Sequence, residues 1–243
     1  MKRGLIGLGL LLSACGAQRQ DPQCVVARAV ASGSTGSFAA TYSLKPGEDP
    51  ASACAQLKSE PVGLQKYLGE EGALDSVGLR TARVGKLVKE AMLDPAAENQ
   101  PNSVGALTTE APGPDNFCEV PVLNPTRLVT LASSSEGAKA LTYEWSGLRI
   151  YNTPSIPGTQ FIADLRYTEN GCTAQYTVRG IWPVVACGSG SKNNEQPPVE
   201  ARCDPYADPP TRLRGSGINP SFPVKCDPIA LICVLTGEVP SVP

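Results

Sequence analysis

The chain has 243 residues, with 21 basic and 23 acidic side chains and no histidine. The lack of histidine excludes catalytic arrangements that need an imidazole, such as a Ser-His-Asp triad, and a formal net charge of −2 gives no electrostatic basis for binding nucleic acid. The length suits one domain of moderate size or two small ones.

The first residues have the order of a secretory signal peptide. Lys2 and Arg3 give a positive start, residues 4–12 form a short apolar run, and Ser13-Ala14 supplies small residues before Cys15. The run is too short to cross a membrane as a helix, which takes about 20 apolar residues.

Leu12-Ser13-Ala14-Cys15 resembles the lipobox of bacterial lipoproteins. In that family the chain is cut just before the cysteine, which then carries a thioether-linked diacylglycerol and an N-acyl chain. The resemblance implies a signal peptide over 1–14 and a lipid-anchored tether over 15–23. Because several acyl chains hold far more firmly than one, Cys15 is expected to be a membrane attachment point and not a catalyst.

The residues after the lipobox cysteine bear on location. Gly16 stands where some lipoproteins carry an aspartate that retains them in the inner membrane, which favours the outer membrane. The eight residues 16–23 reach at most about 28 Å when extended. We therefore expect the folded body, residues 24–243 as a single domain, to lie close to the membrane surface.

Eight further cysteines remain after Cys15, an even number that predicts four disulfides in an exported chain. The sequence alone allows 105 pairings. Proximity in sequence favours the pairs Cys24–Cys54 and Cys226–Cys233. Closeness across a predicted hairpin favours Cys172–Cys187, and elimination leaves Cys118–Cys203. No Cys-x-x-Cys motif occurs, so we expect neither a metal site nor redox chemistry.

Two predicted hairpins account for much of the expected sheet. Residues 24–30 resemble a strand, residues 32–36 a turn, and apolar residues alternate over 38–44. The stronger signal is Asn170-Gly171 between alternating runs at 161–167 and 172–178. A two-residue turn there pairs Tyr167 with Ala174, Leu165 with Tyr176, Ala163 with Val178, and Phe161 with Gly180. Residues 141–151 predict a third strand, whose alternation changes phase at Ser146-Gly147 and so predicts a bulge.

Residues 81–93 form the best helix candidate. Val84, Leu87, Val88 and Ala91 fall at i, i+3, i+4 and i+7 and make one apolar stripe. Three cations on the other side, Arg83, Lys86 and Lys89, favour a solvated face, although they could also meet lipid phosphates or an acidic partner. Prolines break residues 95–127 into short extended pieces, and residues 188–210 form a loop.

Catalytic signals are weak. Ser189-Gly190-Ser191-Lys192 matches Ser-x-x-Lys but lies in a Gly/Ser/Asn loop, where a lysine base would not be desolvated. A glycoside hydrolase would need two carboxylates across a cleft, and the scattered acids Glu110, Asp115, Asp164 and Glu169 give no spacing that supports one.

Three stretches resemble a known family: residues 117–121, residues 167–176, and residues 215–220 together with Cys226-Asp227-Pro228. They are similar to myxobacterial lipoproteins of the MlpA type. The resemblance implies an outer-membrane lipoprotein from a gliding social bacterium. No enzymatic activity is assigned to that family, so there are no catalytic residues to transfer.

These observations predict a β-rich α+β fold: an antiparallel sheet with one or two helices and up to four disulfides. The expected function is a non-enzymatic interaction module of the cell envelope, held to the membrane through Cys15, with an envelope protein as its possible partner and no cofactor. The alternative is an envelope protein that binds carbohydrate or peptide, or a hydrolase, whose cleft forms only in three dimensions.

Overall fold

A computed structural model describes residues 22–27, 37–133, 137–189 and 197–242. The leader 1–14, Cys15 and most of the tether lie outside the described residues. The main sheet contains nine strands, and a small sheet contains two. The strands of the main sheet are β1 (Ser37–Leu44), β2 (Glu60–Tyr67), β3 (Ser76–Thr81), β4 (Ser103–Ala106), β5 (Phe117–Val122), β6 (Thr126–Thr130), β7 (Lys139–Asn152), β8 (Pro157–Glu169) and β9 (Cys172–Ile181). The remaining elements are α1 (Ala82–Glu90), the 3-10 turns η1 (Ala53–Ala55), η2 (Glu200–Cys203) and η3 (Pro209–Thr211), and the small sheet of β10 (Val224–Cys226) and β11 (Cys233–Leu235).

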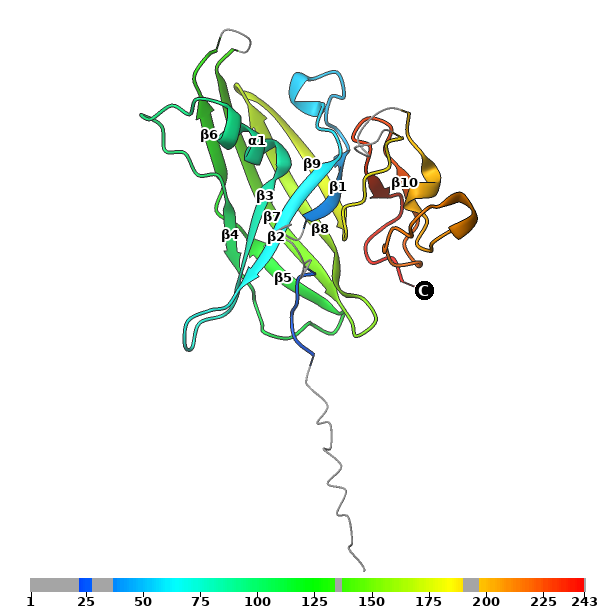
Figure 1. Cartoon of the computed structure of the whole chain (residues 1–243). Coiled ribbons are helices and arrows are strands. Elements are labelled where there is room, and N and C mark those ends of the chain that lie inside the picture. Colours follow the sequence, from blue (N-terminus) through cyan, green and yellow to red (C-terminus); the bar gives the residue numbers. More distant parts are fainter. Residues whose placement is uncertain (1–21, 28–36, 134–136, 190–196, 243) are drawn as a thin grey trace, which may run out of the picture.

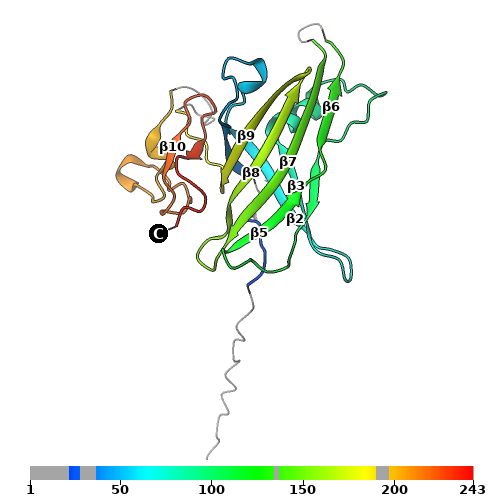
Figure 2. The ribbon, with the colours of Figure 1, turned by 180° about the vertical axis from the view of Figure 1, so that it is seen from behind.

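The main sheet is antiparallel and rolled. Its order is β4-β3-β2-β1-β9-β8-β7-β5, with β6 pairing to β7. The two ends of this order meet, because Thr108 N–H donates to Glu119 O at 2.9 Å and Asn124 N–H donates to Val104 O at 3.0 Å. Figures 1 and 2 show the strands wrapping around a common interior. The predicted β-rich antiparallel fold is confirmed, and the described residues contain one α-helix where one or two were expected.

The Asn170-Gly171 hairpin forms as predicted. Both turn residues have positive φ, 49° and 83°, which is what a tight hairpin turn requires. All four expected partners are confirmed: Tyr167 with Ala174, Leu165 with Tyr176, Ala163 with Val178, and Phe161 with Gly180. The ring of Phe161 covers Gly180 so closely that a Cβ there would lie 2.1 Å from it.

The predicted bulge in β7 is also confirmed. The β7–β8 register shifts between Ser146 and Arg149, and Gly147 has a φ of +55°. The extra residue returns Leu148 to the interior face already occupied by Trp145, and both side chains are buried. The bulge therefore keeps a long strand packed against one core.

The helix is shorter than predicted. It begins after Thr81, whose Oγ1 accepts from Val84 N–H at 3.2 Å as an N-cap. It ends at Glu90 instead of residue 93, because Leu93 forms an antiparallel bridge with Thr130 of β6. The apolar stripe is narrower than expected: Val84 is buried, whereas Val88 is 36% exposed.

The prediction of an N-terminal hairpin is wrong for the part of it that the structure describes. Cys24 and its neighbours up to Ala27 have no regular structure, and residues 28–36 lie outside the described residues. β1 instead pairs with β2 and β9. β1 has the next strand of the chain, β2, on one side and the distant β9 on the other, so neither of its edges is left for the preceding apolar run.

Two hydrophobic clusters stabilise the described chain. The larger fills the rolled sheet and includes Trp145, Tyr167 and Phe38. The smaller lies between the outer side of the sheet, through Ala39 and Ile181, and the segment after residue 182. That segment contains β10 and β11 and packs beside β1 and β9 (Figure 2). The assignment of 24–243 to a single domain stays a prediction.

The cysteines form four disulfides, but none of the expected pairs is correct. The bonds join Cys24–Cys118, Cys54–Cys172, Cys187–Cys226 and Cys203–Cys233.

The structure gives a physical reason why the expected bonds do not form. The expected Cys172–Cys187 bond would have to span β9, and its ten residues extend about 33 Å. Cys226 and Cys233 do face each other in the β10–β11 register, yet their sulfurs bond to Cys187 and Cys203. The expected Cys24–Cys54 and Cys118–Cys203 bonds are replaced because Cys118 lies on β5 beside the entering chain and bonds to Cys24.

Candidate functional site

A cluster of charged and phenolic side chains lies at one end of the rolled sheet, and we call it the Arg83 cluster. Its members are Tyr42, Glu60, Arg83, Tyr167 and Glu169. Arg83 Nη1 donates to the Tyr167 hydroxyl at 2.5 Å, and Nη2 contacts Glu169 Oε1 at 2.7 Å. The Tyr167 hydroxyl donates to Glu169 Oε2 at 2.6 Å. These three groups form a closed triangle of charge-assisted hydrogen bonds.

Glu60 forms the second half of the cluster. Its Oε2 accepts from the backbone N–H of Arg83 at 2.7 Å, and its Oε1 accepts from the Tyr42 hydroxyl at 3.0 Å. Burial raises the pKa of the Glu60 carboxyl, because a buried carboxylate loses hydration. The pKa of the Tyr42 hydroxyl is raised well above its usual value by burial and by the nearby Glu60 charge.

The pKa of the Glu169 carboxyl is shifted in the opposite direction from that of Glu60. Burial disfavours its ionised form, but hydrogen bonds from Tyr167 and Arg83 outweigh that effect and lower the pKa of the Glu169 carboxyl. Burial also raises the pKa of the nearby Tyr143 hydroxyl. Among the described residues, that hydroxyl has no hydrogen-bond partner. The indole N–H of Trp145, whose ring stacks on that of Tyr143 at a centroid distance of 6.3 Å, is also buried without a partner among the described residues.

Four members of the cluster, all except Tyr42, line a cavity of about 400 Å³. The lining residues are Ala53, Gln56, Leu57, Lys58, Glu60, Arg83, Tyr167 and Glu169. None of them is Ser, Thr or Cys, so the cavity offers no hydroxyl or thiol nucleophile apart from a phenol. Both signs of charge meet there, which suits recognition of a polar ligand better than covalent catalysis.

The acids considered from the sequence do not converge. Glu169 belongs to the Arg83 cluster, but Asp164 pairs with Lys45 at 2.8 Å and is half exposed. The backbone oxygen of Glu110 accepts from Cys24 N–H, and Asp115 Oδ1 accepts from Phe117 N–H. Ser189 donates its N–H to Pro197 O, whereas Lys192 lies outside the described residues, so the Ser-x-x-Lys motif gains no support.

Three cysteine sulfurs come within 4.8 Å of one another, those of Cys187, Cys203 and Cys233. All three are oxidised in disulfides, Cys203 with Cys233 and Cys187 with Cys226. Metal binding needs thiolates, so these sulfurs belong to two neighbouring disulfides and are not metal ligands.

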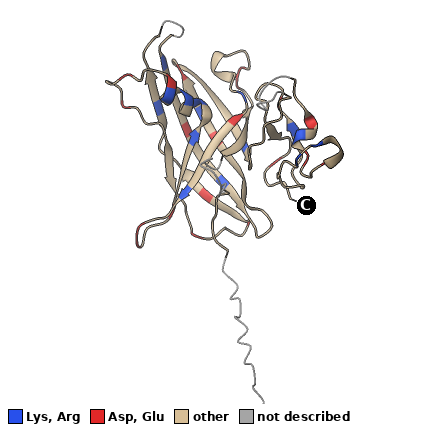
Figure 3. Cartoon of the chain, viewed as in Figure 1, with Lys and Arg blue, Asp and Glu red and all other residues tan. Residues whose placement is uncertain are grey.

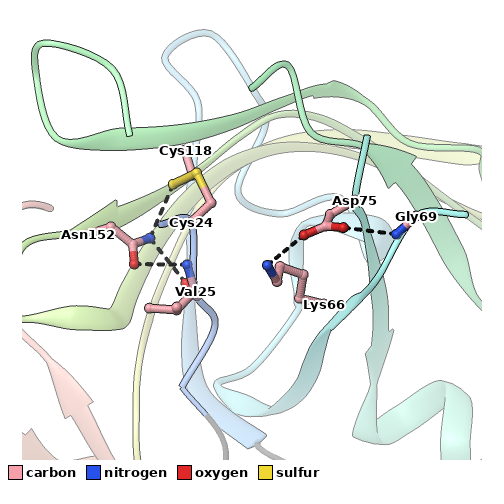
Figure 4. Close-up of polar contacts among 7 residues, drawn as sticks. All are labelled: Cys24, Val25, Lys66, Gly69, Asp75, Cys118 and Asn152. Carbon is pink, nitrogen blue, oxygen red and sulfur yellow. Dashed lines mark hydrogen bonds and ion pairs between the residues drawn. A yellow bond between two sulfur atoms is a disulfide. The ribbon is translucent and has the colours of Figure 1, made fainter. Parts of the chain in front are cut away.

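The chain enters the body at the other end of the sheet, which we call the tether end. Val25 and Asn152 clamp each other: Val25 N–H donates to Asn152 Oδ1, and Asn152 Nδ2 donates to Val25 O, both at 3.1 Å. Asn152 Nδ2 also contacts Cys118 Sγ at 3.4 Å, beside the Cys24–Cys118 disulfide (Figure 4). A covalent bond and a paired amide thus fix the first described residues to the body.

Figure 3 shows charged residues of both signs interspersed over the strands on the side viewed. In the part of the chain that the structure describes, no helix has the length and apolar character needed to cross a membrane.

The family model described as MlpA matches residues 36–183. A protein of Myxococcus xanthus with the name "Putative lipoprotein MlpA" is 30% identical over 247 residues, covering 98% of this chain and 94% of that protein. The chain belongs to the MlpA family. No solved structure matches it. All five members of the Arg83 cluster fall inside the range of the MlpA match, which ends just after β9.

Sequence reasoning found Arg83 and Glu169 separately but assigned Arg83 to a solvated helix face. Glu60 and Tyr42 carried no local signal. The contacts of Arg83 with Tyr167 and Glu169 join residues 84 and 86 positions apart, so only the closed sheet brings the cluster together.

Proposed function

We propose that this MlpA-family protein is anchored in the outer membrane through lipid on Cys15 and acts as a non-enzymatic interaction module of the cell envelope. The lipobox supports the anchor, and membership of a lipoprotein family agrees with it. The proposed partner is an envelope protein.

The observation that carries this proposal is the placement of the Arg83 cluster relative to the tether end. Asn152, which clamps Val25, is the last residue of β7. Ala140, at the other end of β7, donates to Asn170 in the turn that follows Glu169. The 14 residues of β7 span roughly 45 Å. A lipid on Cys15 would therefore hold the tether end at the membrane and present the Arg83 cluster away from it.

The pairing within the cluster supports a binding role over catalysis. Each charged member already has an opposite charge or a hydrogen-bond donor as its partner. A general acid or base must exchange its proton with a substrate, whereas a rigid set of paired charges supplies specificity to an interface.

Photocrosslinking in intact cells tests the proposal. A photoreactive side chain would replace Lys58, an exposed residue at the cavity, in the natural chain and in a Cys15→Ala variant. We expect one defined partner captured by the anchored chain and lost in the variant. Equal capture by both chains would contradict a role for the anchor, and capture of no protein by either would contradict the interaction module.

One observation favours the alternative, a protein that binds carbohydrate or peptide. A cavity of about 370 Å³ between the sheet and the C-terminal segment is lined by Trp182, Tyr206 and several prolines, with Thr159 and Asn219 as polar groups. Aromatic faces beside neutral polar groups suit an uncharged ligand. Titration with envelope glycans and peptides, followed by tryptophan fluorescence, would detect such binding, and a Trp182→Ala variant should abolish the signal.

A further inference from the structure

Three large apolar side chains are exposed at the connection between β2 and β3: Tyr67 is the last residue of β2, and Leu68 and Leu74 lie in the turn that follows. Leu68 is 82% exposed, Tyr67 50% and Leu74 44%. Single exposed apolar residues are ordinary on protein surfaces. Here three of them share one short turn, since Tyr67 pairs with Ser76 in the β2–β3 register and closes the loop. We call Tyr67, Leu68 and Leu74 the apolar tip.

The base of this turn is held in a fixed conformation. Lys66 Nζ contacts Asp75 Oδ2 at 2.6 Å, and Gly69 N–H donates to Asp75 Oδ1 at 2.9 Å (Figure 4). The Lys66 and Asp75 side chains are only 19% and 17% exposed. The turn also closes on itself, because Ala73 N–H donates to Glu70 O at 2.8 Å. Leu68 is therefore held out in solvent by a defined hydrogen-bond pattern.

The apolar tip lies at the tether end. Figures 1 and 2 both show the β2–β3 turn extending to the same end of the molecule as the entering residues 22–27. The backbone agrees, because Leu107 N–H donates to Asp75 O, and three residues further along the chain Glu110 O accepts from Cys24 N–H, both at 2.8 Å. The eight tether residues reach at most about 28 Å. An anchor at Cys15 would thus keep the tip within reach of the same bilayer.

The neighbouring charges indicate which lipid surface fits. Glu70 and Glu71 are exposed within the turn, and both would be repelled by an anionic surface. A zwitterionic interface carries no such repulsion and accepts leucine and tyrosine side chains.

We propose that the apolar tip inserts into the zwitterionic lipid interface beside the anchor and fixes the orientation of the body on the membrane. This inference rests on the proposed lipidation of Cys15. The apolar tip supplies a second, non-covalent contact with the membrane in addition to the lipid on Cys15. These two contacts together orient the body so that the Arg83 cluster faces away from the membrane.

Depth-dependent fluorescence quenching tests this contact. Cells would produce the whole chain with Leu68→Trp, or with Met92→Trp as a matched control. The mature protein isolated from their membranes would then be mixed with phosphatidylcholine vesicles that have brominated acyl chains. Met92 is also highly exposed, at 71%. It lies at the opposite end of the sheet, where its carbonyl accepts from Leu131 N–H. Trp145 and Trp182 contribute the same background to both variants.

We expect the brominated lipid to quench the Leu68→Trp emission at least twofold more than the Met92→Trp emission, with a shift to shorter wavelength. Adding phosphatidylglycerol should reduce the difference because of Glu70 and Glu71. Vesicle flotation separates the two levels of the proposal. Flotation with equal quenching of both variants would overturn the tip contact alone, and failure to float would overturn the anchor and the tip contact together.

Discussion

Replacing Gly180 by alanine tests the packing at the centre of the sheet. An added Cβ would lie 2.1 Å from Phe161 Cε1 and 2.6 Å from its Cζ, whereas carbon atoms in contact normally stand about 3.5–4.0 Å apart. The ring would have to move by about 1.5 Å. It has little room to do so, because Phe161 is fully buried and its ring stands edge-on to Phe38 at a centroid distance of 5.4 Å.

Overpacking of this kind costs about 1–3 kcal/mol, and the lower chain entropy of alanine returns about 0.5–1 kcal/mol. Because a fully buried ring would have to move by about 1.5 Å, we place the cost toward the upper end of that range, at about 2–3 kcal/mol. We therefore expect Gly180→Ala to lower the free energy of unfolding by about 1–2.5 kcal/mol. With a urea m-value of about 3 kcal/mol/M, the unfolding midpoint should fall by about 0.3–0.8 M.

The assay is urea unfolding under non-reducing conditions, followed by circular dichroism. Gly85→Ala is the matched control. Gly85 lies within α1, and apart from the helix's own backbone an added Cβ would have no atom within 4 Å. This substitution should stabilise the protein by about 0.5–1 kcal/mol. In the double variant, Phe161→Leu should relieve part of the cost. A Gly180→Ala midpoint equal to or above that of the natural protein would refute the reasoning.

Three further predictions concern the Arg83 cluster and the entering chain. Arg83→Met should lower the free energy of unfolding by about 1.5–3 kcal/mol, because its charged hydrogen bonds are lost. The control Lys86→Met, at an exposed ion pair, should change that free energy by less than about 0.5 kcal/mol. Urea midpoints that fall equally in the two variants would contradict the prediction. Because the folded pKa of Glu60 is raised, the native state binds more protons than the unfolded state between its ordinary and its raised pKa, so stability should fall as pH rises through that window. Glu60→Gln should make the urea midpoint less dependent on pH across this window. A pH dependence equal to that of the natural protein would contradict the role assigned to Glu60. Removing the Cys24–Cys118 bond with two serines should cost about 2–5 kcal/mol in thermal or urea unfolding, and non-reducing peptide maps should show Cys24 joined to Cys118 and to no other cysteine.

Local signals in the sequence predicted local structure well. Asn170-Gly171 specified a turn, and the turn determined the partners of Phe161 and Tyr167 because antiparallel register follows from the loop. The phase change at Ser146-Gly147 likewise marked the bulge. These features depend on residues close together in the chain, so one sequence was sufficient to predict them.

Features that depend on closure of the sheet were not predictable in the same way. β2 begins at Glu60-Pro61 and contains Gly63, and proline and glycine argue against a strand from sequence alone. β3 and β6 were missed too, and the disulfides join segments that become neighbours only after the sheet rolls. The Arg83 cluster follows the same rule, because its members come from four separate elements or their ends.

The most direct test of the central claim is the mass of the N-terminal peptide of the mature protein, isolated from membranes of cells that produce the natural chain. The account predicts a chain that starts at Cys15 and carries the added mass of a thioether-linked diacylglycerol and an N-acyl chain. A Cys15→Ala chain should yield no lipidated peptide. A mature natural chain that begins elsewhere, or that has an unmodified Cys15, would contradict the anchor and the orientation built on it.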